Sequence, residues 1–92
     1  MIKSFKCPYT EQLFEGNDVP RFTNIRRVAE RKLSILHRSV KLEDLWIPPN
    51  NRLEPLQGDR KGKWSIRINA QWRVCFVWRN GEAFEVEIVD YH

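Results

Sequence analysis

The sequence has little cysteine, and the two cysteines it has exclude several kinds of site. Cys7 and Cys75 are too few for a disulfide framework, and neither lies at metal-ligand spacing from a partner. Cys75 falls within an apolar strand pattern, so we expect it to be a small core residue. His37 also lacks a second His or Cys at ligand spacing. We therefore expect His37 at a helix surface, no metal site, and a reduced, cytoplasmic protein.

Long apolar runs and phosphate-binding glycine loops are absent as well. No apolar stretch approaches the roughly 18 residues of a membrane span. Residues 1–10 contain Lys3, Lys6 and Pro8 where a signal peptide would be apolar. The glycines do not form a phosphate loop. With 92 residues, we expect one domain with a small core and no membrane partner.

Acidic residues are scarce in two segments of a chain whose formal net charge is +4. Residues 21–41 carry seven basic side chains and one acid, Glu30, and residues 59–79 carry six basic side chains and one acid. Basic segments of this kind attract polyanions such as nucleic acid. The alternative for the first segment is an ordinary solvated helix face.

The order of the expected elements predicts an α+β protein. They are a strand over 2–5, helices over 9–15 and 23–38, a helical turn over 42–46, and strands over 63–69, 72–78 and 84–88. Gly16 is expected to end the first helix and Thr23 or Asn24 to cap the second. Pro48 and Pro49 stop any helix, residues 52–57 are expected to be irregular, and Asn80-Gly81 indicates a hairpin.

The long helix and the strands each have one apolar face. The helix stripe consists of Ile25, Ala29, Leu33, Leu36 and Val40. The strand faces are Trp64, Ile66 and Ile68, then Trp72, Val74, Phe76 and Trp78, then Phe84, Val86 and Ile88. Arg67 and Arg73 have the opposite parity, so we expect them on an open sheet face, where arginine is suited to binding phosphate. The alternative is that they pair with cross-strand Glu85 or Glu87.

The last three residues, Asp90, Tyr91 and His92, place a carboxylate, a phenol and an imidazole directly after a strand. Tyr91 shares its parity with Glu85 and Glu87, so the tail is expected to converge with the two arginines. Such a set can cleave RNA without a metal: a base takes the 2′-OH proton, arginine stabilises the charge at phosphorus, and an acid protonates the leaving oxygen. DNA lacks the 2′-OH and is immune to this route. The alternative is a solvated tail with a chance histidine.

The chain resembles the HigB-type toxins of the RelE/ParE superfamily. The resemblance covers essentially all of the chain, and residues 52–60, 64–69, 71–76 and 89–92 carry it most strongly. It implies a single RelE-like domain over residues 1–92, with an N-terminal strand and a two-helix hairpin packed on a curved antiparallel sheet.

The resemblance also implies a function. The protein is expected to be the toxin of a type II toxin–antitoxin system and a ribosome-dependent, metal-independent mRNA endonuclease without a cofactor. Its implied partners are a helix-turn-helix, HigA-like antitoxin and the 70S ribosome with its mRNA. Operator DNA is expected to be bound only through the antitoxin complex.

Site residues carry over by position. The implied catalytic residues are His92, Asp90, Tyr91, Arg73 and Glu54. The implied RNA- or phosphate-binding residues are Arg67, Arg73, Lys63 and Arg60. Well-known members have His where this chain has Glu54, and Lys where it has Gln57, which leaves catalytic strength and codon preference open. Arg26, Arg27 and Arg31 on the basic helix are expected to contact either ribosomal RNA or the antitoxin.

Two other functions compete with the nuclease. One is a toxin of the same fold that does not cut RNA and acts on ribosome function or assembly, or on gyrase; it would tolerate replacement of His92 and Asp90. The other is a structural nucleic-acid binder that uses Arg26, Arg27 and Arg31. Its affinity would fall steeply with salt.

Overall fold

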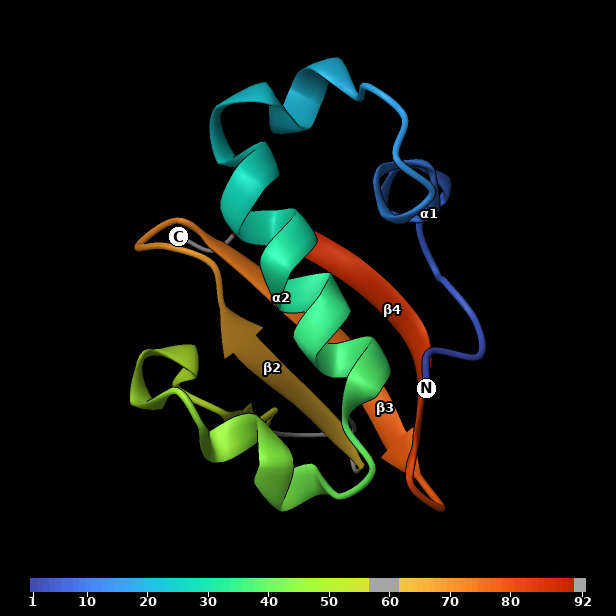
Figure 1. Ribbon diagram of the computed structural model, residues 1–92, viewed down its shortest axis with the longest axis vertical. Helices are drawn as coiled ribbons and strands as arrows, with labels where there is room; N and C mark the ends of the chain where they lie inside the picture. Colours follow the sequence, from blue (N-terminus) through green and yellow to red (C-terminus); the bar gives the residue numbers. More distant parts are fainter. Residues whose placement is uncertain (57–61, 91–92) are drawn as a thin grey trace.

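An α-helix lies across one face of a four-stranded antiparallel sheet in the computed structural model (Figure 1). The structure describes residues 1–56 and 62–90. Its helices are α1 (Pro8–Phe14), α2 (Arg26–Arg38) and the 3-10 helices η1 (Pro20–Ile25), η2 (Leu42–Trp46) and η3 (Pro49–Asn51). Its strands are β1 (Glu54–Pro55), β2 (Lys63–Arg67), β3 (Trp72–Arg79) and β4 (Glu82–Asp90), paired in that order. The predicted α+β class is confirmed.

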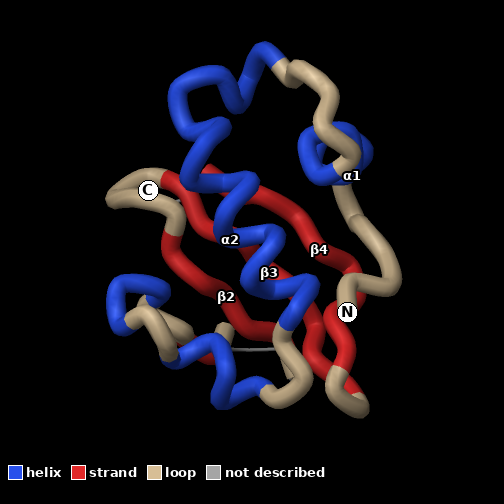
Figure 2. The backbone as a smooth tube through the Cα atoms, viewed as in Figure 1, coloured by secondary structure: helices blue, strands red, loops and turns tan. Residues whose placement is uncertain are grey.

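The sheet and α2 share one hydrophobic core, and Figure 2 shows α2 lying in front of β3, with β2 to one side. Leu33 and Leu36 of α2 are fully buried in the same cluster as Ile66 of β2 and Val74 of β3. The three tryptophans of β2 and β3, Trp64, Trp72 and Trp78, are partly buried against this cluster. The face predicted for the apolar residues of β2 and β3 is therefore confirmed.

The long helix starts later than predicted and ends at Arg38, as predicted. The chain turns as 3-10 helix η1 before α2 begins, and the Thr23 hydroxyl donates to the Pro20 carbonyl at 2.9 Å. The predicted cap at Thr23 or Asn24 is wrong, because α2 begins at Arg26 with Ile25 as its N-cap. At the other end Ser39 takes an extended conformation. Val40 is therefore 70% exposed, not part of the core stripe.

The free edge of β4 is covered by the N-terminal segment and by α1. Ile2 and Phe5 form isolated parallel bridges with Ala83 and Val86. Further along, the Ile88 N–H donates to the Thr10 hydroxyl of α1 at 2.9 Å. The predicted first strand is thus reduced to two bridges. Covering an edge in this way satisfies backbone groups that would otherwise pair with another chain.

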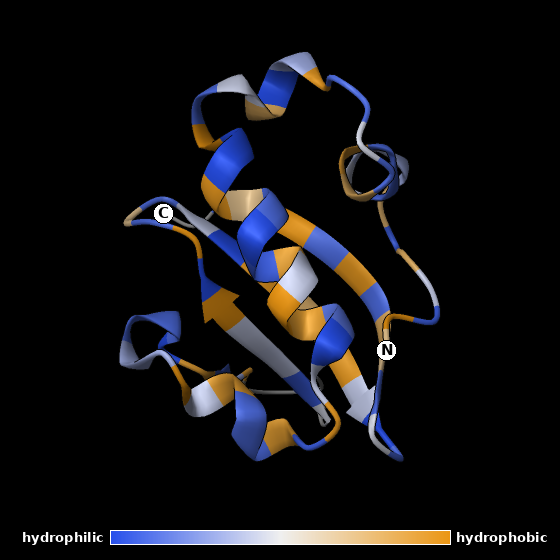
Figure 3. Cartoon of the chain, in the orientation of Figure 1, coloured by the Kyte–Doolittle hydropathy of each residue, from blue (hydrophilic) through white to orange (hydrophobic). Residues whose placement is uncertain are grey.

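A β-bulge in β4 changes which side chains reach the core. Between the pairs Cys75–Glu87 and Val77–Phe84, β4 contains one residue more than β3. Phe84 consequently shares a face with Val77, and the Arg79 guanidinium lies 4.5 Å from the Phe84 ring centroid. The prediction that Phe84 shares one face with Val86 and Ile88 is wrong, because Ala83 takes that place with no exposed area. Figure 3 shows the alternation of apolar and polar residues along β4.

The segment between α2 and the sheet is held by a buried lysine. Lys32 of α2 is 4% exposed, and its ammonium donates to the side-chain oxygen of Asn51, which is fully buried. The Asn51 amide in turn donates to the Leu45 carbonyl at 3.1 Å. Burial, and secondly the charge of Arg31, lowers the pKa of Lys32. This segment contains η3 and β1, where the sequence predicted no helix and an irregular chain.

The Asn80-Gly81 turn joins β3 to β4 as predicted. Asn80 and Gly81 have φ of 50° and 78°. Positive φ at both positions matches the turn type that suits the twist of a two-residue hairpin.

Candidate functional site

Arg73 is held by several polar contacts on the face of the sheet turned away from α2, which we call the outer face. Its Nε donates to the Ser65 hydroxyl at 2.8 Å, and its NH2 donates to the Arg52 carbonyl at 2.6 Å. Its NH2 also lies 3.9 Å from a Glu54 carboxylate oxygen. The side chain is 11% exposed. Arg73 therefore joins β3 to β2 and to the start of β1, and its guanidinium has a fixed orientation.

Arg67 stands directly across from Arg73 in the β2–β3 register. Like charges at facing positions repel one another and destabilise a strand pair. Across residues 1–56 and 62–90, Arg67 makes no ion pair. Two facing guanidinium groups favour a shared anion, and arginine binds phosphate oxygens through two parallel hydrogen bonds. The predicted arginine pair on one face is thus present.

Glu54 and Lys63 flank the arginine pair on the outer face. Glu54 lies opposite Ser65, two residue pairs from Arg73 along the sheet, and its side chain is 60% exposed. Lys63 lies opposite Val77, four residues from Arg67 on β2 and so about 13 Å away. Glu54 is close enough to share a ligand with Arg73, whereas Lys63 marks the far end of the same face. Arg60 and Gln57 lie outside the described residues.

The strand register does not support the alternative in which the arginines pair with glutamates of β4. Val89 stands opposite Arg73, and Glu87 stands opposite Cys75. Glu87 instead pairs with Lys6 of the N-terminal segment, with 3.4 Å between the charged atoms. Cys75 is buried as predicted, at 7% exposure, but it lies outside the main core cluster.

Asp90, the last residue of β4, lies on the opposite face of the sheet from Arg73. It stands opposite Trp72, whose ring packs edge-on against Phe22 on the core side. The Gln71 amide donates to the Asp90 carboxylate at 3.0 Å. The whole tail was expected to converge on the face that carries the arginines. At its position in β4, Asp90 does not lie on that face. Tyr91 and His92 lie outside the described residues.

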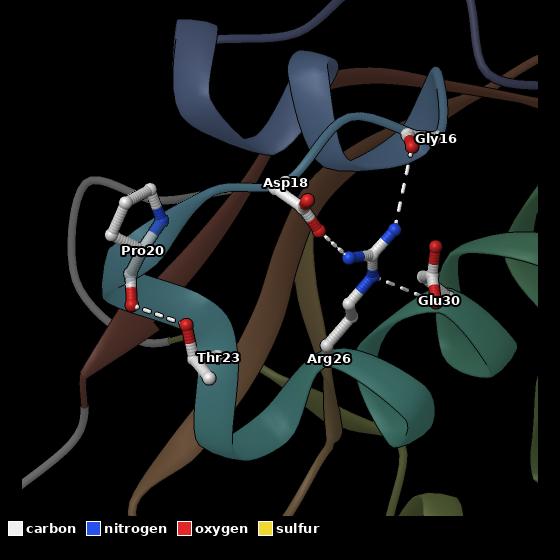
Figure 4. Close-up of polar contacts among 6 residues, drawn as sticks. All are labelled: Gly16, Asp18, Pro20, Thr23, Arg26 and Glu30. Atoms are coloured by element: carbon white, nitrogen blue, oxygen red, sulfur yellow. Dashed lines mark hydrogen bonds and ion pairs between the residues drawn. The ribbon is translucent and has the colours of Figure 1, made fainter.

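Arg26, the first of the three helix arginines, is engaged within the chain (Figure 4). It pairs with Asp18 and with Glu30, the latter at 3.6 Å, and donates to the Gly16 carbonyl at 3.4 Å. Arg26 thus connects the loop after α1 to the start of α2. Arg27 and Arg31 are exposed, so they are the members of the predicted set that present charge to solvent.

Among the described residues, no three His, Cys, Asp or Glu side chains gather closely enough to hold a metal ion. His37 has a structural contact: its Nδ1 accepts from the Ile2 N–H at 3.2 Å, and its ring lies 5.2 Å from that of Phe14. No described helix is long and apolar enough to cross a membrane.

Residues 3–92 match the family model of the RelE-like toxin of type II toxin–antitoxin system HigB. The chain belongs to the HigB-like toxin family. It is 41% identical over 85 residues to toxin HigB-1 of Vibrio cholerae, covering 90% of each chain. It is 37% identical over 99 aligned residues to endoribonuclease HigB of Proteus vulgaris, covering 100% of each. As a type II toxin, it has a cognate antitoxin.

Solved structures show that this HigB-like toxin has a RelE-like fold. YafQ from Escherichia coli superposes with a TM-score of 0.69 at 13% identity, covering 98% of this chain and 91% of YafQ. A YoeB/ParE toxin from Agrobacterium tumefaciens gives a TM-score of 0.52 at 25% identity, covering 98% of both chains. The fold is thus shared at low sequence identity.

Sequence reasoning missed two groups that orient Arg73 in this toxin, the Ser65 hydroxyl and the Arg52 carbonyl. Ser65 is 1% exposed although it faces away from the main core. The signal for Ser65 in the sequence was its position two residues before Arg67, which places both residues on the outer face of β2. A backbone carbonyl leaves no signal in side-chain patterns. Arg52 has a positive φ of 45°, and an arginine at this position does not indicate one.

Proposed function

We propose that this HigB-like toxin is an endoribonuclease that cuts mRNA on the ribosome. The observation that carries the proposal is the oriented Arg73 guanidinium, with Arg67 directly opposite and Glu54 at 3.9 Å. A positive group held in one orientation, with a second one opposite it, suits the phosphate at which charge develops during cleavage. The name of the Proteus vulgaris relative, an endoribonuclease, supports the same reaction class.

In the proposed mechanism the 2′-OH of the substrate attacks the adjacent phosphorus and the 5′-oxygen leaves. A base removes the 2′-OH proton, and Glu54 is a candidate because it lies beside Arg73. Arg67 and Arg73 stabilise the negative charge at phosphorus. Tyr91 and His92 are proposed to act at the leaving oxygen, with Asp90 orienting the tail. No step in this scheme needs a metal ion or a cofactor.

The proposed partners follow from the same scheme. The mRNA is presented by the 70S ribosome, which places the reaction in the cytoplasm. Arg27 and Arg31 on the opposite side of the molecule contact either ribosomal RNA or a HigA-like helix-turn-helix antitoxin, and operator DNA is reached through that antitoxin. Lys63 extends the phosphate-binding face beyond the arginine pair, and Arg60 is proposed as a further phosphate-binding residue from its place in the sequence.

Deletion of His92 tests the proposal. Wild type and the deletion variant are expressed from an inducible promoter, and mRNA 5′ ends are mapped in both. Codon-phased cuts in wild type that are absent in the variant support a ribosome-dependent nuclease with chemistry in the tail. Growth arrest without new cuts, equal in both proteins, contradicts it and directs the search to ribosome function or gyrase.

A further inference from the structure

A small hollow lies on the outer face beside the arginine pair, and of its lining residues the proposed function uses only Lys63. Its volume is about 130 Å³. Cys75 and Val77 of β3 and Val89 of β4 line it, so its lining is partly apolar. Lys63, Glu85 and Glu87 also line it and bring charge of both signs. On this measure one water needs about 10–15 Å³, so the hollow has room for several waters, which suits one base rather than a whole nucleotide.

The position of the hollow relative to Arg73 matches the layout of one nucleotide. Val89 both lines the hollow and stands opposite Arg73. Cys75 follows Arg73 by two residues on the same face of β3, which places it about 7 Å along the strand. This separation is comparable to the distance from a phosphate to its base. A nucleotide whose phosphate binds the arginine pair therefore has a recess within reach of its base.

Glu85 brings an exposed carboxylate to the hollow. It lies at the β4 bulge with φ of 52°, and its backbone N–H donates to the Ser4 hydroxyl at 2.9 Å. Within the described residues its carboxylate forms no ion pair, whereas that of neighbouring Glu87 pairs with Lys6. Lys63, also at the hollow, forms no ion pair within the same residues. An acceptor and a donor thus both face the recess.

We infer that the hollow binds one base of the RNA and prefers guanine. Guanine presents N1–H and N2–H donors side by side, which a carboxylate accepts as a pair, and it presents O6 and N7 acceptors that a lysine reaches. Adenine offers a single donor group on that edge, and uracil places carbonyls against the carboxylate. Glu85 is the specificity-determining residue, Lys63 supplies the donor, and Val77 and Val89 contact the ring. This inference rests on the proposed function, because it needs RNA on the outer face.

Nucleotide titration tests the inference without relying on cleavage. Guanosine 5′-monophosphate and adenosine 5′-monophosphate are titrated separately into ¹⁵N-labelled toxin, and the backbone amides of Glu85, Glu87 and Val89 are followed by NMR. We expect the guanine nucleotide to saturate these signals at a concentration about tenfold lower or more than the adenine nucleotide. The preference is expected to vanish in Glu85→Gln.

Glu82→Gln is the matched control. Glu82 is another β4 carboxylate, but it pairs with Lys3 at 3.3 Å and does not line the hollow. It is expected to keep the guanine preference. Equal affinity for the two nucleotides, or a preference that survives Glu85→Gln, overturns the inference.

Mapping of mRNA 5′ ends in the same variants separates this inference from the proposed function. Cuts that retain their base bias in Glu85→Gln overturn the guanine pocket and leave the nuclease standing. Wild-type toxin that binds guanine nucleotide but makes no cuts keeps the pocket and overturns the nuclease.

Discussion

Ser65 shows how one small residue sets the geometry of the candidate site. Its hydroxyl accepts from Arg73 Nε at 2.8 Å, and it is almost completely buried. Orientation of a group before the reaction matters because a charge that must reorganise contributes less to transition-state stabilisation. Ser65 is accordingly a positioning residue, acting through Arg73 rather than on the substrate.

Ser65→Ala is expected to lower both stability and activity. The variant leaves a nearly buried guanidinium N–H without its acceptor, which costs about 1–3 kcal/mol in free energy of unfolding. Cleavage is expected to slow through kcat, with substrate binding less affected, because both arginine charges remain. Urea denaturation and single-turnover cleavage measure the two effects.

Ser34→Ala serves as the control, because Ser34 is exposed on α2. A surface change of this kind is expected to stay within about 0.5 kcal/mol of wild type. If Ser65→Ala cleaves at the wild-type rate, the orienting role assigned to Ser65 is wrong.

At the level of elements, the bulge in β4 decides which residues of that strand stabilise the fold. Strict alternation places Phe84, Val86 and Ile88 together. In the structure Val86 and Ile88 are buried, while Phe84 lies on the other face. Because the side-chain period of a strand is two, one inserted residue moves everything before it to the opposite face.

Alanine substitutions at Val86 and Phe84 test the bulge. Val86→Ala removes two fully buried methyl groups and is expected to cost about 1.5–3 kcal/mol. Phe84→Ala removes a larger ring that is only partly buried, and it is expected to cost less than Val86→Ala. Thermal unfolding of both variants provides the comparison. A loss of about 3–5 kcal/mol for Phe84→Ala, the usual cost for a core phenylalanine, would place Phe84 in the core after all.

The elements that sequence alone predicted are those whose pattern is regular over several residues. The buried positions of α2 and the faces of β2 and β3 follow from simple periodicity. Long-range contacts decided the rest. The start of α2 depends on Arg26 binding Gly16 and Asp18, and β1 exists because Glu54 and Pro55 pair with β2. The bulge at Glu85 depends on the N-terminal segment, which the local sequence of β4 does not encode.

For the candidate site, residue types and strand parity placed Arg67 and Arg73 correctly but not their surroundings. Facing positions on β2 and β3 follow from the short turn between the strands. The contact between Arg73 and Glu54 depends on β1, a strand that the sequence did not predict. The roles given to Tyr91, His92 and Arg60 stay predictions.

Across the whole molecule, positive charge is divided between two sides. Arg67 and Arg73 lie on the outer face of the sheet, and Arg27 and Arg31 lie on α2, which covers the opposite face. Arg26 is largely neutralised by Asp18 and Glu30. A protein with two charged sides is able to bind mRNA with one and a second polyanion with the other.

Salt dependence of ribosome binding is expected to reveal the second side. In the double variant Arg27→Gln, Arg31→Gln, the slope of log affinity against log salt concentration should fall by up to about one unit for each arginine that contacts phosphate. Arg26→Gln, the matched control, should leave the slope nearly unchanged and mainly lower the melting temperature. An unchanged slope in the double variant would assign this face of α2 to the antitoxin.

The bridges between the N-terminal segment and β4 also have a consequence for synthesis. Ile2 pairs with Ala83 and Phe5 pairs with Val86, so residues of the N-terminal segment find their partners only when a much later part of the chain has been made. A nascent chain that stops within β3 has no β4 to pair with. The sheet of this toxin therefore closes only after β4 has been synthesised, long after the segment that covers its edge.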